Sequence, residues 1–347
     1  MGPTGRARIL QVHPTRRCNL RCLHCYSSSG PEERDALPAA LLKDALTDAR
    51  AEGYSVAGFS GGEPLLYKPL GEVLQHAKEC GLVTTVTSNG MLLDQKSLQM
   101  LRGRADLLAI SLDGIPESHN RMRASTCAFE VMQARLEGVR QARIPFGFIF
   151  TLTRQNLHEL EPVAAFAKEQ GARLLQIHPL EGAGRARETL PGFQPDEVRS
   201  AYAFLETLRL QSMLGDGLRV HVDLFDRAVL QSRPELVFAE DIPENTVESP
   251  LAELISPLII QADGSLVPLQ YGFASKYALG SLYEESLPEL AAKWRLRVFP
   301  QFRELSRRVY RQSVNPDVLP FFNWYEVIAQ EARLEEESSP CEQLTKK

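Results

Sequence analysis

The stretch SVAGFSGGEPLLYKPLGEVLQHAKECGLVTTVTS, residues 55–88, contains one complete strand–helix–strand unit. Its two ends, SVAGFS and LVTTVTS, are short apolar runs of the kind that form buried strands. Between them, four apolar residues recur at helical spacing: Leu70, Val73, Leu74 and Ala77. Because a helix between two neighbouring strands returns the chain to the same edge of the sheet, the two strands are expected to pair in parallel.

The same unit recurs through the first two thirds of the chain. The predicted strands are ARILQV (7–12), SVAGFS (55–60), LVTTVTS (82–88), LLAISL (107–112), PFGFIFTLT (145–153) and RLLQIH (173–178). A stretch with helical periodicity follows each of them. Six such units predict an α/β fold, either a (β/α)6 partial TIM-type barrel or a strongly curved open sheet. We expect the partial barrel, with a small α+β module at the C-terminus.

The strand–helix rhythm changes after about Leu218. We expect a core at 1–217, a last βα element and linker at 218–250, and a C-terminal module at 251–347. The module contains SPLIIQADGSLVPLQYG, in which two apolar runs flank Asp263-Gly264 and predict a hairpin. The remainder is predicted to be helical and to end in an acidic tail.

Composition and charge narrow the class of protein. The chain has 347 residues, 44% of them hydrophobic, and a formal net charge of -5. This charge favours neither nucleic acid nor an anionic membrane as a partner. The first residues lack the apolar core of a secretory signal, and no apolar run approaches the length of a membrane span. A cytoplasmic protein is the expectation.

The segment CNLRCLHC places Cys18, Cys22 and Cys25 in one loop directly after the first predicted strand. Thiolates bind soft metals and iron–sulfur clusters, and a 4Fe–4S cluster normally takes four of them. Three ligands would leave one iron open to a substrate or cosubstrate. The alternative is a structural zinc site, which needs four ligands. His13 is a possible fourth ligand by position, so the spacing alone leaves both metals open.

The CxxxCxxC spacing, with His24 at the aromatic position before the last cysteine, resembles the signature of radical S-adenosylmethionine (SAM) enzymes. The resemblance implies one 4Fe–4S cluster on Cys18, Cys22 and Cys25, with SAM bound at the open iron. It implies reductive cleavage of SAM to methionine and a 5′-deoxyadenosyl radical. It also implies an electron donor such as flavodoxin or ferredoxin.

Three further segments match motifs of that family in order. Gly61-Gly62-Glu63-Pro64 resembles the GGE motif that holds the amino group of SAM, and polar residues end the third and fourth strands. Each segment alone fits an ordinary turn. All of them follow carboxyl ends of parallel strands, where barrel folds assemble their active sites. The candidate cofactor-binding residues are Gly61, Gly62, Glu63, Pro64, Ser88, Asn89, Ser111, Asp113, Arg123, Asn156 and His178. For Arg123 the alternative is a surface ion pair.

The C-terminal module resembles the SPASM or twitch region of many family members, whose DGxxxPC pattern ligates an auxiliary cluster. Leu269 stands where that cysteine is expected, and no cysteine lies between Cys127 and Cys341. The resemblance therefore implies that the auxiliary cluster is absent and that the module serves as a lid or substrate wall. Cys127 and Cys341 are weak candidates for a hydrogen-atom donor, with packing or no role as the alternatives.

Two kinds of substrate remain open. The resemblance favours a ribosomally synthesised peptide that undergoes epimerisation, crosslinking or oxidation. Because the first strand starts near Arg8, we expect no N-terminal recognition domain, which leaves room for a separate peptide-recognition protein. A small molecule in cofactor or natural-product biosynthesis is the other candidate. Two readings without radical chemistry are a zinc-stabilised binding protein and a catalytically silent SAM-binding partner.

Overall fold

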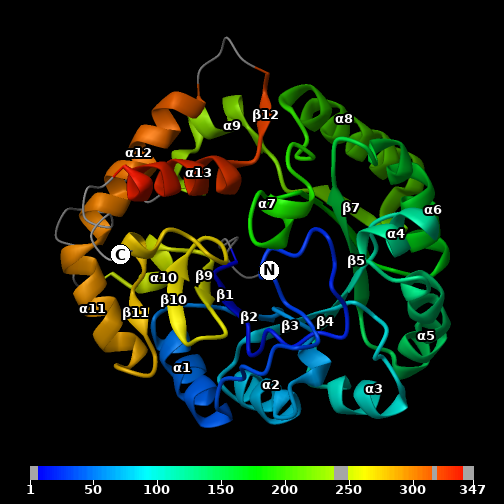
Figure 1. The fold of residues 1–347 in the computed structure, drawn as a ribbon, viewed down its shortest axis with the longest axis horizontal. Coiled ribbons are helices and arrows are strands. Elements are labelled where there is room, and N and C mark those ends of the chain that lie inside the picture. The colour runs from blue at the N-terminus through cyan, green and yellow to red at the C-terminus, as the bar shows by residue number, and fades with distance from the viewer. Residues whose placement is uncertain (1–6, 238–248, 315–318, 339–347) are drawn as a thin grey trace, which may run out of the picture.

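The computed structural model describes residues 7–237, 249–314 and 319–338. Its main sheet has ten strands in the order β11-β10-β9-β1-β2-β3-β4-β5-β6-β7. Seven of them are parallel neighbours in chain order: β1 (Ile9–Val12), β2 (Val56–Phe59), β3 (Val83–Ser88), β4 (Leu107–Ser111), β5 (Phe146–Leu152), β6 (Leu174–Pro179) and β7 (Arg219–Val222). The sheet is strongly curved, and most of the helices that connect its parallel strands lie on its outside (Figure 1). The predicted partial barrel is confirmed.

The helices of this first part follow the strands as the periodicity predicts. They are α1 (Ala39–Ala51), α2 (Leu70–Glu79), α3 (Gln95–Leu101), α4 (Glu117–Met122), α5 (Ala128–Ala142), α6 (Leu160–Glu169), α7 (Arg185–Thr189) and α8 (Glu197–Leu214). Helices α4 and α7 are short additional elements that follow β4 and β6. Both lie at the end of the barrel where the chain leaves the strands.

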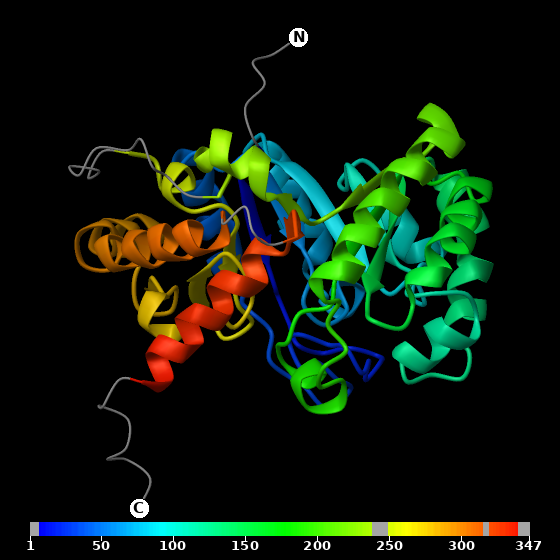
Figure 2. The same cartoon turned by 90° about the horizontal axis from the view of Figure 1, so that it is seen from above.

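The predicted hairpin is present, and it continues the core sheet. Strand β9 (Leu258–Ile260) pairs in parallel with β1, and β10 (Ser265–Pro268) pairs antiparallel with β9. The remaining elements are β8 (Phe225–Asp226), α9 (Arg227–Ser232), α10 (Leu251–Leu254), β11 (Gly280–Ser281), α11 (Leu287–Arg297), α12 (Phe299–Ser313), β12 (Phe321–Phe322) and α13 (Trp324–Glu337). Helices α12 and α13 lie in the gap between the two ends of the open sheet (Figures 1 and 2).

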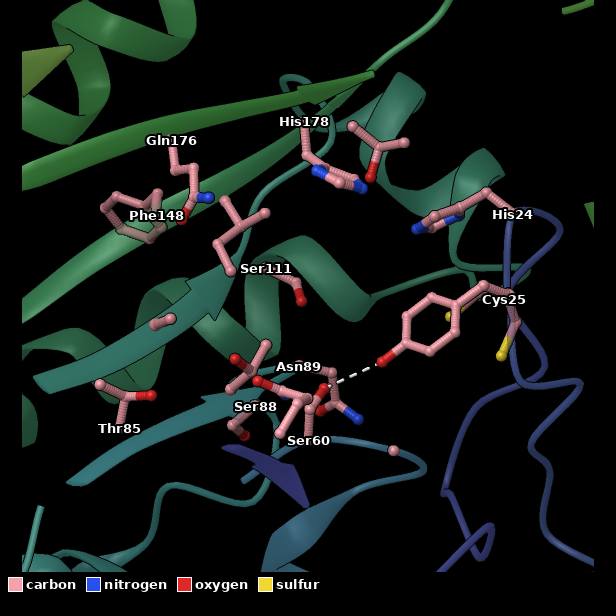
Figure 3. Close-up of a pocket in the computed structure, with 18 of the residues that line it drawn as sticks. His24, Cys25, Ser60, Thr85, Ser88, Asn89, Ser111, Phe148, Gln176 and His178 are labelled. Atoms are coloured by element: carbon pink, nitrogen blue, oxygen red, sulfur yellow. Dashed lines mark hydrogen bonds between the residues drawn. The ribbon is translucent and has the colours of Figure 1, made fainter. Parts of the chain in front are cut away.

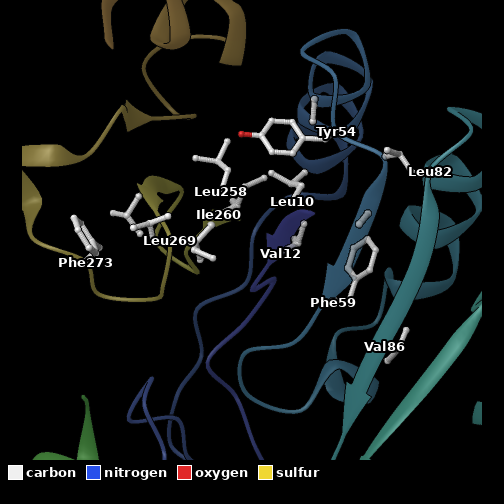
Figure 4. Packing of buried hydrophobic residues seen from close by; sticks show 14 of the residues in the cluster. Leu10, Val12, Tyr54, Phe59, Leu82, Val86, Leu258, Ile260, Leu269 and Phe273 are labelled. Carbon is white, nitrogen blue, oxygen red and sulfur yellow. The ribbon is translucent and has the colours of Figure 1, made fainter. Parts of the chain in front are cut away.

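The core forms where the outward-facing side chains of the strands meet the helices. Leu10 and Val12 of β1 are completely buried, and Phe59 of β2 and Ile260 of β9 pack nearby (Figure 4). Tyr54 donates a hydrogen bond from its hydroxyl to the carbonyl oxygen of Ile255, at 3.0 Å. The apolar layer is therefore continuous from the core into the C-terminal hairpin. None of the helices within the described ranges is both long and apolar enough for a bilayer crossing.

A buried ion pair joins α1 to α11. The Arg295 guanidinium bonds the Glu52 carboxylate and also donates to the carbonyl oxygen of Ser249 at 3.1 Å. The same carboxylate accepts a hydrogen bond from the Leu251 backbone at 2.8 Å. The side chains of Arg295 and Glu52 are 7% and 14% exposed, so removal of either one would leave the other charge largely buried and without its oppositely charged partner.

We expect Glu52→Ala to lower the free energy of unfolding by about 3 kcal/mol, because it leaves Arg295 buried and unpaired. The matched control is Glu253→Ala, which removes the partner of Arg8 in an ion pair whose side chains are more than a third exposed. That control should cost less than about 1 kcal/mol. Urea denaturation followed by circular dichroism measures both, and equal losses would contradict the assignment.

Candidate metal and cofactor site

The barrel encloses a cavity of about 440 Å³ that reaches from the loops after the strands down to the first residues of several strands. The three cysteines of the loop after β1 line it. Polar residues at the ends of β2, β3 and β4 line it as well, among them Ser60, Asn89 and Ser111 (Figure 3). Deeper in the barrel the lining includes Gln11, Thr85 and Gln176. Apolar residues, among them Ile9, Val56 and Leu107, line the same region, so the deep wall of the cavity is mixed in polarity, as is usual for a site that binds a small molecule.

The loop that carries the cysteines, residues 13–30, is folded back on itself. The Cys18 backbone donates to the carbonyl oxygen of Gly30 at 3.0 Å, and the Gly30 backbone donates to the carbonyl oxygen of Arg16 at 3.2 Å. The loop after β2 supports it, since the Glu63 backbone donates to the carbonyl oxygen of Arg17 at 2.9 Å. Gly62 permits this contact, because a Cβ there would lie 2.2 Å from that same carbonyl oxygen.

The three thiols fit an iron–sulfur cluster. Cys18, Cys22 and Cys25 are free cysteines and line the same cavity. Burial raises the pKa of Cys18 to about 12 and raises the pKa of Cys22. Three adjacent thiolates would therefore be costly unless a cationic group bound them, which is how metal binding couples to proton release.

Hydrogen-bond donors already point at the sulfur atoms. The Leu20 backbone donates to Cys18 Sγ at 3.5 Å, and the Ser29 backbone donates to Cys25 Sγ at 3.3 Å. Arg123 Nη1 donates to Cys22 Sγ at 3.7 Å. Such donors to ligating sulfur atoms are typical of iron–sulfur proteins, whose potentials they tune.

The zinc alternative fits less well. Across the described parts of the chain, no three His, Cys, Asp or Glu side chains converge on one point as a single ion requires. His13, the possible fourth ligand, stacks instead on Tyr271 with ring centroids 4.8 Å apart and meets Tyr26 edge-on at 5.6 Å.

Glu63 lies behind the cavity wall. Its carboxylate accepts hydrogen bonds from the Ser88 hydroxyl and the Asn89 backbone, both at 2.9 Å, and from the Leu65 backbone at 3.2 Å. Gly61, Gly62, Ser88 and Asn89 line the cavity, whereas Glu63 does not. The carboxylate therefore fixes the loop after β3 against the loop after β2.

Asp113 and Arg123 form a second buried pair next to the cysteines. Arg123 Nη2 lies 2.6 Å from Asp113 Oδ2, and the Thr151 backbone donates to Asp113 Oδ1 at 3.1 Å. Desolvation alone would raise the pKa of Asp113, but the Arg123 charge, with smaller contributions from His24 and His119, outweighs it and holds that pKa below its usual range. Asp113 is thus a carboxylate that positions Arg123 on the cavity wall.

The opposite wall, from β6, carries a different set of groups. His178 Nδ1 lies 3.0 Å from Asp223 Oδ2, and His178 Nε2 lies 3.1 Å from Glu181 Oε1. Desolvation lowers the pKa of His178, but these two hydrogen bonds outweigh it and raise the pKa well above its ordinary value. Gln176 also donates to Asp223, at 2.7 Å. His178 and His24 point toward one another across the cavity (Figure 3).

Several predicted residues do not reach the cavity. Asn156 uses its side chain within its own loop, accepting from the Thr153 backbone at 2.7 Å and donating to the carbonyl oxygen of Thr151 at 2.9 Å. Pro64 begins a short 3₁₀ helix, Pro64–Leu66, and does not line the cavity. Cys127 precedes α5 and is exposed, away from the lining residues. Cys341 lies outside the described residues.

The contacts of Gly184 and Arg185 with the cysteine loop were not predicted from the sequence. The only local signal is the run EGAGRAR, whose glycines follow directly after a predicted strand. Tyr26 was also missed; its hydroxyl lies 3.1 Å from Ser60 Oγ on the cavity wall (Figure 3).

Comparisons with known proteins agree with this geometry. Residues 12–167 match the family model of the Radical SAM superfamily. Fe-coproporphyrin III synthase of Methanosarcina barkeri is 31% identical over 173 residues, which are 49% of this chain and 43% of that protein. The cysteine-type anaerobic sulfatase-maturating enzyme of Clostridium perfringens is 22% identical over 295 residues, 79% of this chain and 76% of that enzyme.

Solved structures share the fold. SuiB of Streptococcus suis, crystallised with the precursor peptide SuiA, superimposes with a TM-score of 0.66 at 15% sequence identity. The match covers 85% of this chain and 66% of that one, so it extends beyond the core. The chain spans about half the length of the curated relatives that it matches at about 30% identity.

The burial of Glu63 predicts a pH-dependent effect on stability. Desolvation outweighs the three hydrogen bonds and raises the pKa of Glu63 from 4.5 to about 7. The carboxyl group therefore binds its proton more tightly in the folded protein, and this contribution is present below about pH 4.5 and lost as the pH rises through 7. Relative to Glu63→Gln, the wild type should lose about 3 kcal/mol of unfolding free energy over that range.

Urea denaturation of the metal-free protein, at several pH values between about 5 and 8, measures this difference. Subtracting the unfolding free energy of the variant from that of the wild type at each pH removes the contribution of the other titrating groups. A difference that stays constant with pH would show that Glu63 is ionised throughout, with its three donors dominating over burial.

Proposed function

Because the chain belongs to the radical SAM superfamily, we propose that it is a radical SAM enzyme with one 4Fe–4S cluster ligated by Cys18, Cys22 and Cys25. The observation that carries the proposal is the placement of three free, mostly buried thiols on one cavity, beside the Gly61-Gly62 loop. Three ligands leave one iron for SAM to chelate.

The chemistry that the cluster and SAM supply when bound is a 5′-deoxyadenosyl radical, which abstracts a hydrogen atom from the substrate. The chain itself binds, orients and shields these groups. Gly61 and Gly62 let the backbone approach the methionyl amino group, and Ser111 offers its hydroxyl group to the ribose or the carboxylate. Ser88 and Asn89 line the same wall, with side chains that already bond Glu63 and Asn19. We assign Glu63 and Asp113 the role of positioning these groups from behind the wall.

Arg123 is the proposed partner of the methionyl carboxylate. Its guanidinium is held by Asp113 on one side and reaches Cys22 Sγ on the other. Its Nε is buried and has no hydrogen-bond partner within the described part of the chain. A guanidinium on the wall of a cavity is suited to a carboxylate, to which it can donate charge-assisted hydrogen bonds.

We propose that the substrate is a ribosomally synthesised peptide that undergoes epimerisation, crosslinking or oxidation. The similarity in fold to SuiB, solved with a precursor peptide, supports this choice and includes the C-terminal module. The peptide would face the wall formed by Gln176, His178 and Glu181, on the side away from Arg123. A separate recognition protein, and an electron donor such as flavodoxin or ferredoxin, complete the proposal, with the enzyme in the cytoplasm and with neither nucleic acid nor membrane as partner.

A small-molecule substrate is the second candidate. The relatives at about 30% identity include Fe-coproporphyrin III synthase and AdoMet-dependent heme synthase. Their similarity covers about half of this chain. A short open reading frame beside the gene, whose peptide product changes mass when incubated in deuterated water with the reconstituted enzyme, reductant and SAM, would decide for the peptide, because epimerisation then adds one deuterium and crosslinking or oxidation removes hydrogen. If the mass of the peptide stays unchanged while the enzyme cleaves SAM, the result favours a small-molecule substrate.

The cluster assignment predicts the effect of single cysteine variants. Cys18→Ala, Cys22→Ala and Cys25→Ala should each abolish the reductant-dependent formation of 5′-deoxyadenosine after anaerobic reconstitution, because two thiolates do not hold the cluster. Cys80→Ser and Cys127→Ala are the matched controls and should keep both the cluster and full SAM cleavage. Iron and sulfide analysis and chromatography of the nucleoside products measure the outcome.

Two results would contradict the proposal. One equivalent of zinc without sulfide in the wild type would identify a structural metal site. A complete cluster without 5′-deoxyadenosine above the Cys18→Ala level would identify a silent SAM-binding protein.

A further inference from the structure

We propose that Arg185, at the start of α7, is a positioning residue that clamps the cysteine loop and places an uncompensated positive charge against the cluster. The contact joins two segments that are far apart in the sequence. Arg185 Nη1 donates to the carbonyl oxygen of Cys22 at 2.8 Å, and Arg185 Nη2 donates to the carbonyl oxygen of Ser29 at 2.7 Å. One planar guanidinium therefore fixes two points of the loop at once.

The same segment adds two further contacts, one from its backbone and one from a side chain. The Arg185 N–H donates to the carbonyl oxygen of Cys25 at 2.8 Å, and the Thr189 hydroxyl donates to the carbonyl oxygen of Leu23 at 2.6 Å. The β6–α7 segment thus bonds the carbonyl groups of two of the three cysteines. Together with the side-chain bonds, these contacts span the loop from Cys22 to Ser29.

Gly184 makes this approach possible. Its φ is +52°, and a Cβ at this position would lie 2.1 Å from the carbonyl oxygen of Tyr26 and 2.6 Å from that of Cys25. Contacts this short with backbone atoms cannot be relieved by a side-chain movement. The segment and the cysteine loop therefore meet backbone to backbone, which leaves the loop little freedom on this side.

The charge of Arg185 has no acidic partner among the described residues. Three other arginines near the loop are paired, Arg123 with Asp113, Arg16 with Asp35 and Arg21 with Glu32, whereas Arg17 is exposed to solvent and forms no ion pair among the described residues. The ion pairs of the described residues include none for Arg185, whose donors go to neutral carbonyl groups. A cluster held by three thiolates is anionic, so this half-buried cation is matched to it in charge.

Two effects follow, and they are separable. The two hydrogen bonds from the Arg185 guanidinium to the carbonyl groups of Cys22 and Ser29 order the loop whether or not a cluster is bound. The positive charge stabilises the more negative, reduced state of the cluster and so raises its reduction potential. The second effect rests on the proposed function, whereas the first does not.

The test compares Arg185→Gln, Arg185→Lys and the control Arg187→Gln. Arg187 lies on the same helix, with a side chain 66% exposed, so the control removes an equal charge without touching the loop. In metal-free protein, Arg185→Gln should speed amide hydrogen exchange in the peptide that covers residues 16–30, and the control should not. Circular dichroism confirms that each variant is folded.

In the reconstituted protein, Arg185→Gln should release iron to a chelator on the order of 10-fold faster than the wild type. Its cluster should also have a more negative midpoint potential, measured by electron paramagnetic resonance during a redox titration. Arg185→Lys keeps the positive charge but cannot form both hydrogen bonds of the guanidinium. Its midpoint potential should therefore approach that of the wild type, while its cluster should still lose iron faster.

If Arg185→Gln exchanges its amide hydrogens and releases iron at the rates of the wild type, Arg185 does not hold the cysteine loop. A potential equal in Arg185→Gln and the wild type would overturn the electrostatic role. If the wild type itself assembles no cluster, the proposed function fails, and the exchange measurement on metal-free protein still decides whether Arg185 holds the loop.

Discussion

The loop of residues 13–30 lies between two glycines, and its conformation depends on their having no side chain. Gly62 approaches it from the loop after β2, where a Cβ would lie 2.2 Å from the carbonyl oxygen of Arg17. Gly184 approaches it from the loop after β6, where a Cβ would lie 2.1 Å from the carbonyl oxygen of Tyr26. Contact on both sides holds a segment without helix or strand in one conformation. The positions of the three thiols therefore depend on these contacts.

The surroundings of the thiols explain why they require a bound group. Burial disfavours the thiolates, as the raised pKa of Cys18 and of Cys22 shows. Hydrogen-bond donors and the Arg123 guanidinium nevertheless point toward the sulfur atoms. An arrangement that is unfavourable for three empty thiolates and favourable for sulfur atoms bound to a metal is characteristic of a preorganised metal site.

Much of the core followed from local patterns in the sequence. The apolar runs identified all six expected strands, and parallel pairing placed the segments around Gly62, Ser88 and Ser111 at the same end of the barrel. Where the prediction was incomplete, the cause was side-chain direction or sequence distance. Asn156 follows β5 as expected, but the oxygen and the nitrogen of its side-chain amide both form hydrogen bonds within its own loop. Arg185 contacts a residue 163 positions away, which no local periodicity can indicate.

The pairing of β9 with β1 has a consequence for how the chain can be divided. Without the hairpin, β1 would become an edge strand with a row of unpaired backbone donors and acceptors, directly before the loop that carries the thiols. Such an edge is a template for pairing with strands of other molecules. A fragment that ends after the βα units would therefore tend to self-associate. In the full chain, the pairing of β9 with β1 prevents this by covering the edge of the first strand.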